Sequence, residues 1–176
     1  MVERERRVVV GVSQSLAGLA ALRYAVAEAR GRNAPLYTVR AWALPSHWRG
    51  LAVDAWQREL REASHRYVVE AFDAALGGPP DIDILVAAPN GRADEVLIEA
   101  ADREDDLLVL GGRDGWRRRW PGWIARGCLR RAHCPVIVVP PPSLARAAGP
   151  LARLRLLRAA ARFAAEGSPR QHLPQR

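Results

Sequence analysis

The clearest fold signal in this chain is the stretch Asp106-Leu-Leu-Val-Leu-Gly-Gly-Arg-Asp-Gly115, which is followed by Cys134-Pro-Val-Ile-Val-Val-Pro140. Residues 107–110 and 136–139 are short apolar runs, typical of strands that are buried on both faces of a parallel sheet. Between them, apolar side chains recur at helical spacing over 124–132. This order predicts a loop at the carboxyl end of a parallel strand, where the free N–H groups of a helix can receive an anion.

Three further strands and three further helices are expected before this stretch. Apolar and β-branched runs predict the strands, at 7–12, 34–43 and 82–87. Periodic apolar residues predict the helices, at 15–30, 53–76 and 92–102. Strands that alternate with helices give a parallel sheet with right-handed crossovers. We therefore predict a single doubly wound α/β domain of five parallel strands over residues 1–140.

The composition changes after Pro140. Three consecutive prolines interrupt regular structure, and residues 141–176 form a proline- and arginine-rich tail. Within it, 151–166 has arginines on one helical face and apolar residues on the other, which predicts an amphipathic helix. Such a helix can lie on an anionic membrane surface, or dock on its own domain or on a partner.

The charge excludes one class of function. The 176 residues carry a net charge of +8, and all 27 basic residues are arginine. Segments 113–131 and 141–176 each hold seven arginines against one acidic residue, so the body of the domain is acidic. Indoles between the loop arginines, such as Trp116 and Trp120, could stack on bases, or they could cover apolar surface. Because the basic charge is confined to one loop-and-helix and one tail, a nucleic-acid partner is not expected.

The sequence offers neither a metal site nor a catalytic constellation. Cys128 and Cys134 lack metal-ligand spacing, and the four histidines stand apart. The thiols are expected to be structural in a reducing cytosol. Asp105 and Asp106 are expected to be solvated turn residues. We find no signal peptide and no apolar run of membrane-spanning length, so a cytoplasmic protein is predicted.

The order and spacing of these segments resemble the universal stress protein family over roughly residues 6–140. The resemblance includes Val8-Val-Val-Gly-Val-Ser13, Leu22-Arg-Tyr-Ala-Val-Ala27 and Val86-Ala-Ala-Pro89. It implies a Rossmann-like fold of the adenine-nucleotide α-hydrolase group, with strand order 3-2-1-4-5. The crevice then lies between the first and fourth strands, and ATP is its candidate ligand. The candidate crevice residues are Gly11, Ser13, Val39, Gly111, Gly115, Arg117, Gly122 and Trp123.

The phosphate end of this crevice departs from the pattern of ATP-binding relatives, G-x2-G-x9-G-[S/T]. Asp114 stands at the second glycine, the gap to Gly122 is about two residues short, and Trp123 replaces the hydroxyl residue. The first loop also lacks the expected aspartate, since it reads Gly11-Val-Ser-Gln-Ser15. Arg117–Arg119 could still supply charge-assisted phosphate contacts.

Two functions follow from the resemblance. The first is a regulatory binding protein of the stress response in which ATP binding is weak or lost. The alternative is an ATP-binding member, or a weak ATPase, that uses an arginine-rich phosphate loop. Whether the chain is an enzyme stays open at this point.

The last strand predicts self-association. Val136–Val139 would be an exposed apolar sheet edge in a monomer, and such edges pair unless they are covered. The resemblance implies a homodimer through this strand. Alternatively, the tail folds over the edge, and an unidentified protein partner is also compatible with the sequence.

Overall fold

The computed structural model describes residues 6–43, 53–112 and 122–143. The predicted tail helix at 151–166 lies outside the described residues. By internal contacts Met1–Pro142 is one compact unit, to which all the described elements belong. In chain order these are β1 (Val8–Gly11), α1 (Leu16–Arg32), β2 (Leu36–Val39), α2 (Val53–Leu76), β3 (Ile84–Ala87), α3 (Ala93–Ala100), β4 (Leu107–Gly111), α4 (Trp123–Arg131) and β5 (Val136–Val139).

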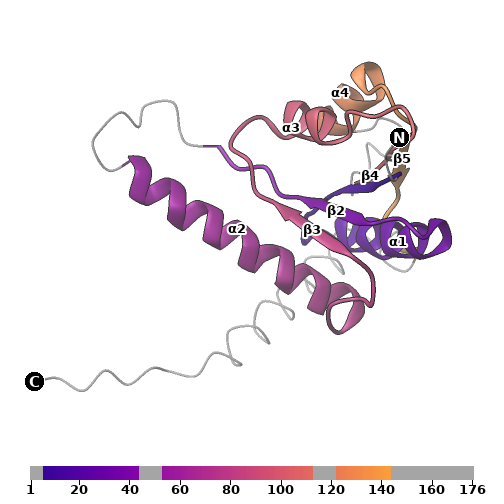
Figure 1. Cartoon of the computed structure of the whole chain (residues 1–176), viewed down its shortest axis with the longest axis horizontal. Coiled ribbons are helices and arrows are strands. Elements are labelled where there is room, and N and C mark those ends of the chain that lie inside the picture. The colour runs from indigo at the N-terminus through magenta and orange to yellow at the C-terminus, as the bar shows by residue number, and fades with distance from the viewer. Residues whose placement is uncertain (1–5, 44–52, 113–121, 144–176) are drawn as a thin grey trace, which may run out of the picture. The chain divides into compact units, whose positions relative to one another are not determined.

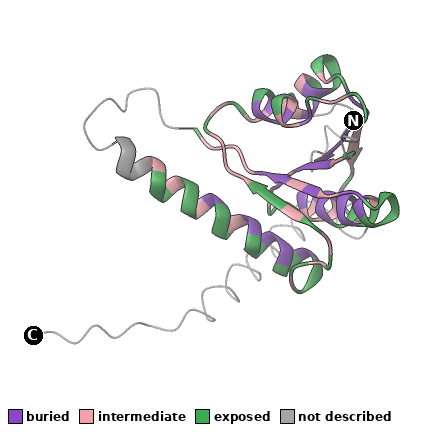
Figure 2. Ribbon diagram, viewed as in Figure 1, coloured by how far each residue is buried: buried purple, intermediate pink, exposed green. Residues whose placement is uncertain are grey.

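The five strands form one parallel sheet in the order β3-β2-β1-β4-β5, which confirms the predicted fold. Helices α1 and α2 cover one face, and α3 and α4 cover the other (Figure 1). Because side chains alternate along a strand, Val8 and Val10 enter the core beneath α1, whereas Val9 packs under α3 and α4. All three valines are fully buried, as expected for a central strand covered on both faces. By contrast, exposed residues run along α2 from Arg58 to Leu76 (Figure 2).

Both ends of α1 follow the capping rules. Ser15 is the N-cap, and its hydroxyl accepts the N–H of Gly18 at 3.0 Å. Asn33 ends the helix in the left-handed conformation, with φ of 49°, and its N–H bonds to the carbonyls of Ala29 and Arg30. The predicted start and stop of this helix are therefore within two residues of those observed.

The second strand is shorter than predicted. It spans Leu36–Val39 rather than 34–43. Ala34 donates its N–H to the carbonyl of Ala29, so this residue belongs to the helix terminus. Beyond the strand, Trp42 forms an isolated bridge with Asn90 and does not extend β2. The third strand and third helix are likewise shorter, at Ile84–Ala87 and Ala93–Ala100.

The prediction for Asp106 was wrong, because this residue is buried rather than solvated. Its carboxylate accepts from Nε of Arg7 at 3.1 Å and from Nη2 at 2.6 Å. Nη2 of Arg7 also bonds to Asp102 at 2.6 Å. The bonds to Asp106 raise the pKa of the Arg7 guanidinium. This ion pair joins the start of β1 to the start of β4, at the end of the sheet opposite the crevice.

No helix in the described part of the chain is both long enough and apolar enough to cross a membrane.

Candidate functional site

A cavity of about 420 Å³ lies at the carboxyl ends of β1, β2 and β4. Helices α3 and α4 complete its wall. In parallel α/β sheets, ligands bind where the strand order reverses, which here is between β1 and β4. The structure brings six of the eight candidate residues to this cavity, namely Gly11, Ser13, Val39, Gly111, Gly122 and Trp123. Gly115 and Arg117 lie outside the described residues.

Two glycines in the cavity wall are needed for packing, whatever the ligand. A Cβ on Gly111 would lie 2.8 Å from the backbone nitrogen of Gly18 in the first turn of α1. A Cβ on Gly11 would lie 3.2 Å from the side chains of Leu110 and Leu97. Gly111 therefore lets β4 approach α1 closely, and Gly11 lets β1 pack against Leu97 of α3 and Leu110 of β4.

The loop after β1 is fastened to α2. The backbone N–H of Gln14 donates to the hydroxyl of Tyr67 at 2.7 Å, and its side-chain amide donates to Glu70 at 3.0 Å. Ser13 and Ser15 share a hydrogen bond between their hydroxyls at 2.9 Å. Gln14 thus holds the loop that carries Ser13 into the cavity wall. Sequence reasoning did not predict this role, because no local signal points to partners of Gln14 that are 53 and 56 residues away.

Arg40 is a lining residue that sequence reasoning missed. It follows β2 directly, and its guanidinium carbon lies 4.1 Å from the centroid of the Tyr67 ring. Its backbone N–H donates to the carbonyl of Ala87 at 2.9 Å. One signal could have found it: a charged residue immediately after a buried strand stands at the ligand-binding end of a parallel sheet.

Trp123 occupies the end of the cavity where the family pattern has a hydroxyl. Gly122 caps α4 without a side-chain hydrogen bond, and the indole that follows is 60% exposed. Trp123 also lines a neighbouring cleft of about 440 Å³ between α3 and α4. The guanidinium of Arg92 lies over this indole, 5.9 Å from the ring centroid.

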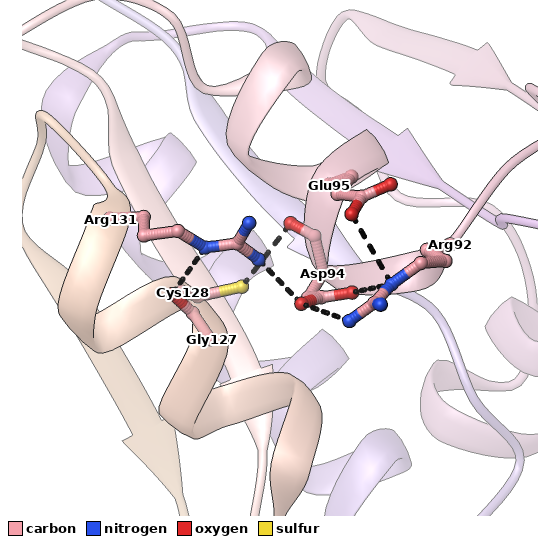
Figure 3. A network of polar contacts seen from close by, with 6 residues as sticks. All are labelled: Arg92, Asp94, Glu95, Gly127, Cys128 and Arg131. Atoms are coloured by element: carbon pink, nitrogen blue, oxygen red, sulfur yellow. Dashed lines mark hydrogen bonds and ion pairs between the residues drawn. The ribbon is translucent and has the colours of Figure 1, made fainter.

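A buried carboxylate organises that second cleft (Figure 3). Asp94 of α3 accepts from Nη2 of Arg131 of α4 at 2.5 Å. On its other side it accepts from Nε and Nη2 of Arg92 at 3.3 and 3.2 Å. A Cβ on Gly127 would lie 2.7 Å from a carboxylate oxygen of Asp94, so α4 can approach this carboxylate only with glycine there. The network fastens α4, and with it Trp123, to α3.

The pKa of Asp94 lies below its ordinary value. Burial acts to raise it, but the hydrogen bonds from Arg92 and the positive charges of Arg92 and Arg131 outweigh burial. Asp94 is therefore ionised at neutral pH and forms charge-assisted bonds between the two helices.

Asp94→Asn is expected to lower the thermal midpoint by a few degrees at pH 7. Since the folded-state pKa is depressed, the stabilising contribution is present above the unfolded pKa, about 3.9, and is lost as the pH falls through the folded value. Melting curves from pH 7 down to about pH 2 should show the difference from wild type disappearing. Asp81→Asn, at the exposed ion pair with Arg30, is the control and should change the midpoint little. A difference that persists at low pH contradicts this account.

The two thiols are buried and free. Burial, with a smaller contribution from the charge of Asp94, raises the pKa of Cys128 to about 11. Burial also raises the pKa of Cys134. Thiols that stay protonated at neutral pH are poor nucleophiles. Their role is packing on the α3/α4 side of the sheet.

Among residues 6–43, 53–112 and 122–143, no group of three or more histidine, cysteine or acidic side chains is placed to hold a metal ion.

The sheet order and the cavity at its switch point define a Rossmann-like α/β protein with a ligand crevice between β1 and β4. Residues 5–140 match the Universal stress protein family, and the chain belongs to that family.

Named relatives agree with this assignment. Universal stress protein Rv2623 of Mycobacterium tuberculosis is 30% identical over 145 residues, which cover 75% of this chain and 46% of that protein. Universal stress protein Rv2624c of the same organism is 30% identical over 136 residues, covering 76% and 48%. The chain therefore spans about half the length of these curated relatives.

Solved structures match the fold as well. A universal stress protein in complex with cAMP aligns with a TM-score of 0.59 at 25% identity, covering 78% of this chain and 99% of the other. The universal stress protein UspA from Lactobacillus plantarum aligns with a TM-score of 0.55 at 26% identity, covering 77% and 98%.

Proposed function

We propose that this chain is a regulatory binding protein of the cytoplasmic stress response whose crevice takes a compact adenine nucleotide and binds ATP weakly or not at all. The observation that carries the proposal is Trp123, whose exposed indole stands in the cavity wall at the position of the expected hydroxyl. A solved relative, 25% identical, is in complex with cAMP, a nucleotide with a single phosphate. The buried free thiols agree with a reducing compartment.

The size and lining of the crevice support a small ligand. Its volume falls within the range of about 300–1,000 Å³ that is usual for small-molecule sites. The described walls are mainly apolar, with Val39, Leu97 and Leu110 among them, which suits a base and a sugar ring. At the phosphate end, each lost hydrogen bond to a charged phosphate costs about 1.5–3 kcal/mol. The loss of a small hydroxyl and the bulk of the indole therefore act against a triphosphate.

An ATP-binding protein or weak ATPase is the second candidate. One observation favours it: the cleft beyond Trp123 is lined by four arginines, Arg92, Arg126, Arg130 and Arg131. Arginine clusters can hold a polyphosphate through charge-assisted bonds. Against it, Arg92 and Arg131 already bond to Asp94, and no group of three or more histidine, cysteine or acidic side chains among the described residues could hold a metal ion.

Trp123→Ser is expected to raise the affinity for ATP about tenfold or more, because it restores a hydroxyl and frees volume at the phosphate end. Isothermal titration with ATP and magnesium measures this, beside wild type and Leu129→Ser, which exchanges another exposed apolar residue of α4. Low-micromolar ATP binding by the wild type that is abolished by changing Arg117–Arg119 to alanine would overturn the proposal in favour of the second candidate.

We also infer that the chain forms a homodimer through β5. All four residues of this edge strand are partly exposed, although each is a β-branched apolar residue. Pairing of two such edges would extend the sheet and cover this surface. Light scattering should give twice the mass of one chain, and Ile137→Lys should shift the mass toward that of the monomer. A monomer mass for both the full chain and a version ending at Pro142 would refute this pairing.

A further inference from the structure

The cleft between α3 and α4 carries a surplus of positive charge. Its described lining holds four arginines and a single carboxylate, that of Asp94. The sequence of α4 contains no acidic residue that could balance these charges. Arg130 and Arg131 lie in the last turn, where the helix dipole favours cations, but Arg126 lies nearer the amino end, where the dipole does not favour them. The helix dipole therefore does not account for the whole cluster.

Two of these arginines keep donors for a further acceptor (Figure 3). Arg131 bonds to Asp94 through Nη2 and to the carbonyl of Gly127 through Nε. Arg92 bonds to Asp94 and Glu95 through Nε and Nη2. Within the described part of the chain, neither side chain uses Nη1 as a donor. Since Arg92 is 63% exposed and Arg131 is 48% exposed, N–H groups of both remain within reach of an acceptor that enters the cleft.

Trp123 adds an apolar contact to the same cleft. Its indole lines the cleft and is 60% exposed. The guanidinium of Arg92 lies over the indole, 5.9 Å from the ring centroid, and is itself bonded to Asp94. The aromatic ring and the charges therefore support one another before a partner binds, which lowers the entropy cost of binding. Tryptophan and arginine are also the residue types that contribute most of the binding energy at protein interfaces.

The arrangement suits an acidic peptide better than a compact polyanion or a nucleic acid. Arg92 and Arg131 share the carboxylate of Asp94, so the cleft does not direct all its donors at one point, as a polyphosphate would require. Carboxylates spaced along a peptide can instead meet the arginines one at a time through charge-assisted bonds. Single-stranded nucleic acids are bound on several aromatic side chains, whereas the described lining offers the one indole of Trp123.

We propose that this cleft is the docking site for an acidic segment of a partner protein, whose carboxylates pair with Arg130 and Arg131 and whose apolar side chain packs on Trp123. The inference rests on the proposed function in one respect, since it names the partner of a regulatory binding protein. It does not require a nucleotide in the crevice. Complementary charge steers the encounter and excludes basic partners, and the indole supplies the apolar contact.

Fluorescence anisotropy tests the charges, with a fluorescein-labelled peptide of glutamate and glycine around one phenylalanine. Arg130→Glu should weaken binding about tenfold or more, because it removes an ion pair and places a like charge beside the peptide. Arg66→Glu, at an exposed residue of α2, makes the same change in net charge and should stay within about twofold of wild type. Equal losses would show that only the overall charge of the protein attracts the peptide, and would overturn the docking site.

A second peptide, in which alanine replaces the phenylalanine, tests the apolar contact. This exchange should weaken binding to wild type about threefold or more, but change binding to Trp123→Ala by less than about twofold, because the indole is then absent. The Nε1–H signal of Trp123, assigned in nitrogen-15 spectra by its absence from Trp123→Ala, should also shift when the first peptide is added to wild type. The same loss in both proteins, or a signal that does not move, overturns the docking site.

Other occupants would give different results. A single-stranded oligonucleotide of equal charge that binds more tightly than the peptide, and loses affinity in Arg130→Glu, would overturn the proposal in favour of nucleic acid. A mass above that of a dimer in light scattering, reduced by Arg130→Glu, would overturn it in favour of a second copy of the chain. Should Arg130→Glu not fold, Arg130→Gln and the signal of Trp123 decide in its place.

Titration with cAMP separates this inference from the proposed function. If cAMP does not bind while the peptide results hold, the nucleotide part of the proposed function fails and the docking site stands. If cAMP binds but wild type does not bind the peptide at physiological salt, the docking site is overturned and the proposed nucleotide binding stands.

Discussion

Gly18→Ala is expected to lower the free energy of unfolding by about 3 kcal/mol, at the upper end of the usual cost of overpacking. A Cβ at this position would overlap both the hydroxyl and the carbonyl oxygen of Ser13. The hydroxyl could rotate away, but the carbonyl belongs to the backbone of the loop after β1. Moving that loop would strain the bond from Gln14 to Tyr67 and displace Ser13 from the cavity wall.

Urea denaturation measures this effect, and the same helix provides the control. Gly31 also lies in α1, but a Cβ there meets no atom within 4 Å. Gly31→Ala should therefore stabilise the fold by about 0.5–1 kcal/mol, through the better helix propensity of alanine. Equal denaturation midpoints for the two variants would contradict the close approach of α1 to this loop.

Arg7→Ala is expected to have a comparable effect, about 3 kcal/mol. The variant leaves the carboxylate of Asp106, whose side chain is 0% exposed, without its guanidinium. Among the described residues, the other donor to this carboxylate is the backbone N–H of Arg103 at 3.3 Å, which replaces little of a two-bond ion pair. Removing one partner of a buried pair is costly because an uncompensated charge stays in the core.

Asp102→Asn distinguishes the stability contribution of the Arg7–Asp102 ion pair from that of the Arg7–Asp106 pair. The side chain of Asp102 is 65% exposed, so solvent screens its ion pair and the change should affect stability little. Urea denaturation of both variants at neutral pH is the measurement. A large loss for Asp102→Asn with a small loss for Arg7→Ala would show that the buried pair does not stabilise this end of the sheet.

Local patterns predicted the elements of this fold well. The β-branched runs at Val8–Gly11 and Val136–Val139 can be recognised because the strands are short, apolar and bounded by polar or turn residues. The long helix Val53–Leu76 was predicted with its observed bounds, since Gly77 and Gly78 stop it. The strand order, by contrast, came from the family resemblance, because local patterns carry no information about which parallel strands are neighbours.

The parts that sequence reasoning missed depend on long-range packing. Arg7 and Asp106 are 99 residues apart, and nothing near Asp106 in the chain distinguishes a buried acid from a solvated one. Gly111 contacts the first turn of α1 across a similar gap. At the site, the resemblance pointed to six residues that line the cavity, but it directed attention to the glycine loop and away from Arg40.

The residues that line the crevice come from separate segments of the sequence between Gly11 and Ala125, and they lie side by side only in the folded chain. A compound that fills it therefore binds the folded state alone and shifts the unfolding equilibrium by mass action. At a hundred times its Kd, such a compound adds about 2.7 kcal/mol of stability. A melting-temperature screen of a metabolite library thus amounts to a chemical search for the natural ligand, and the melting shift of each hit reports its affinity without a label or an assay of activity.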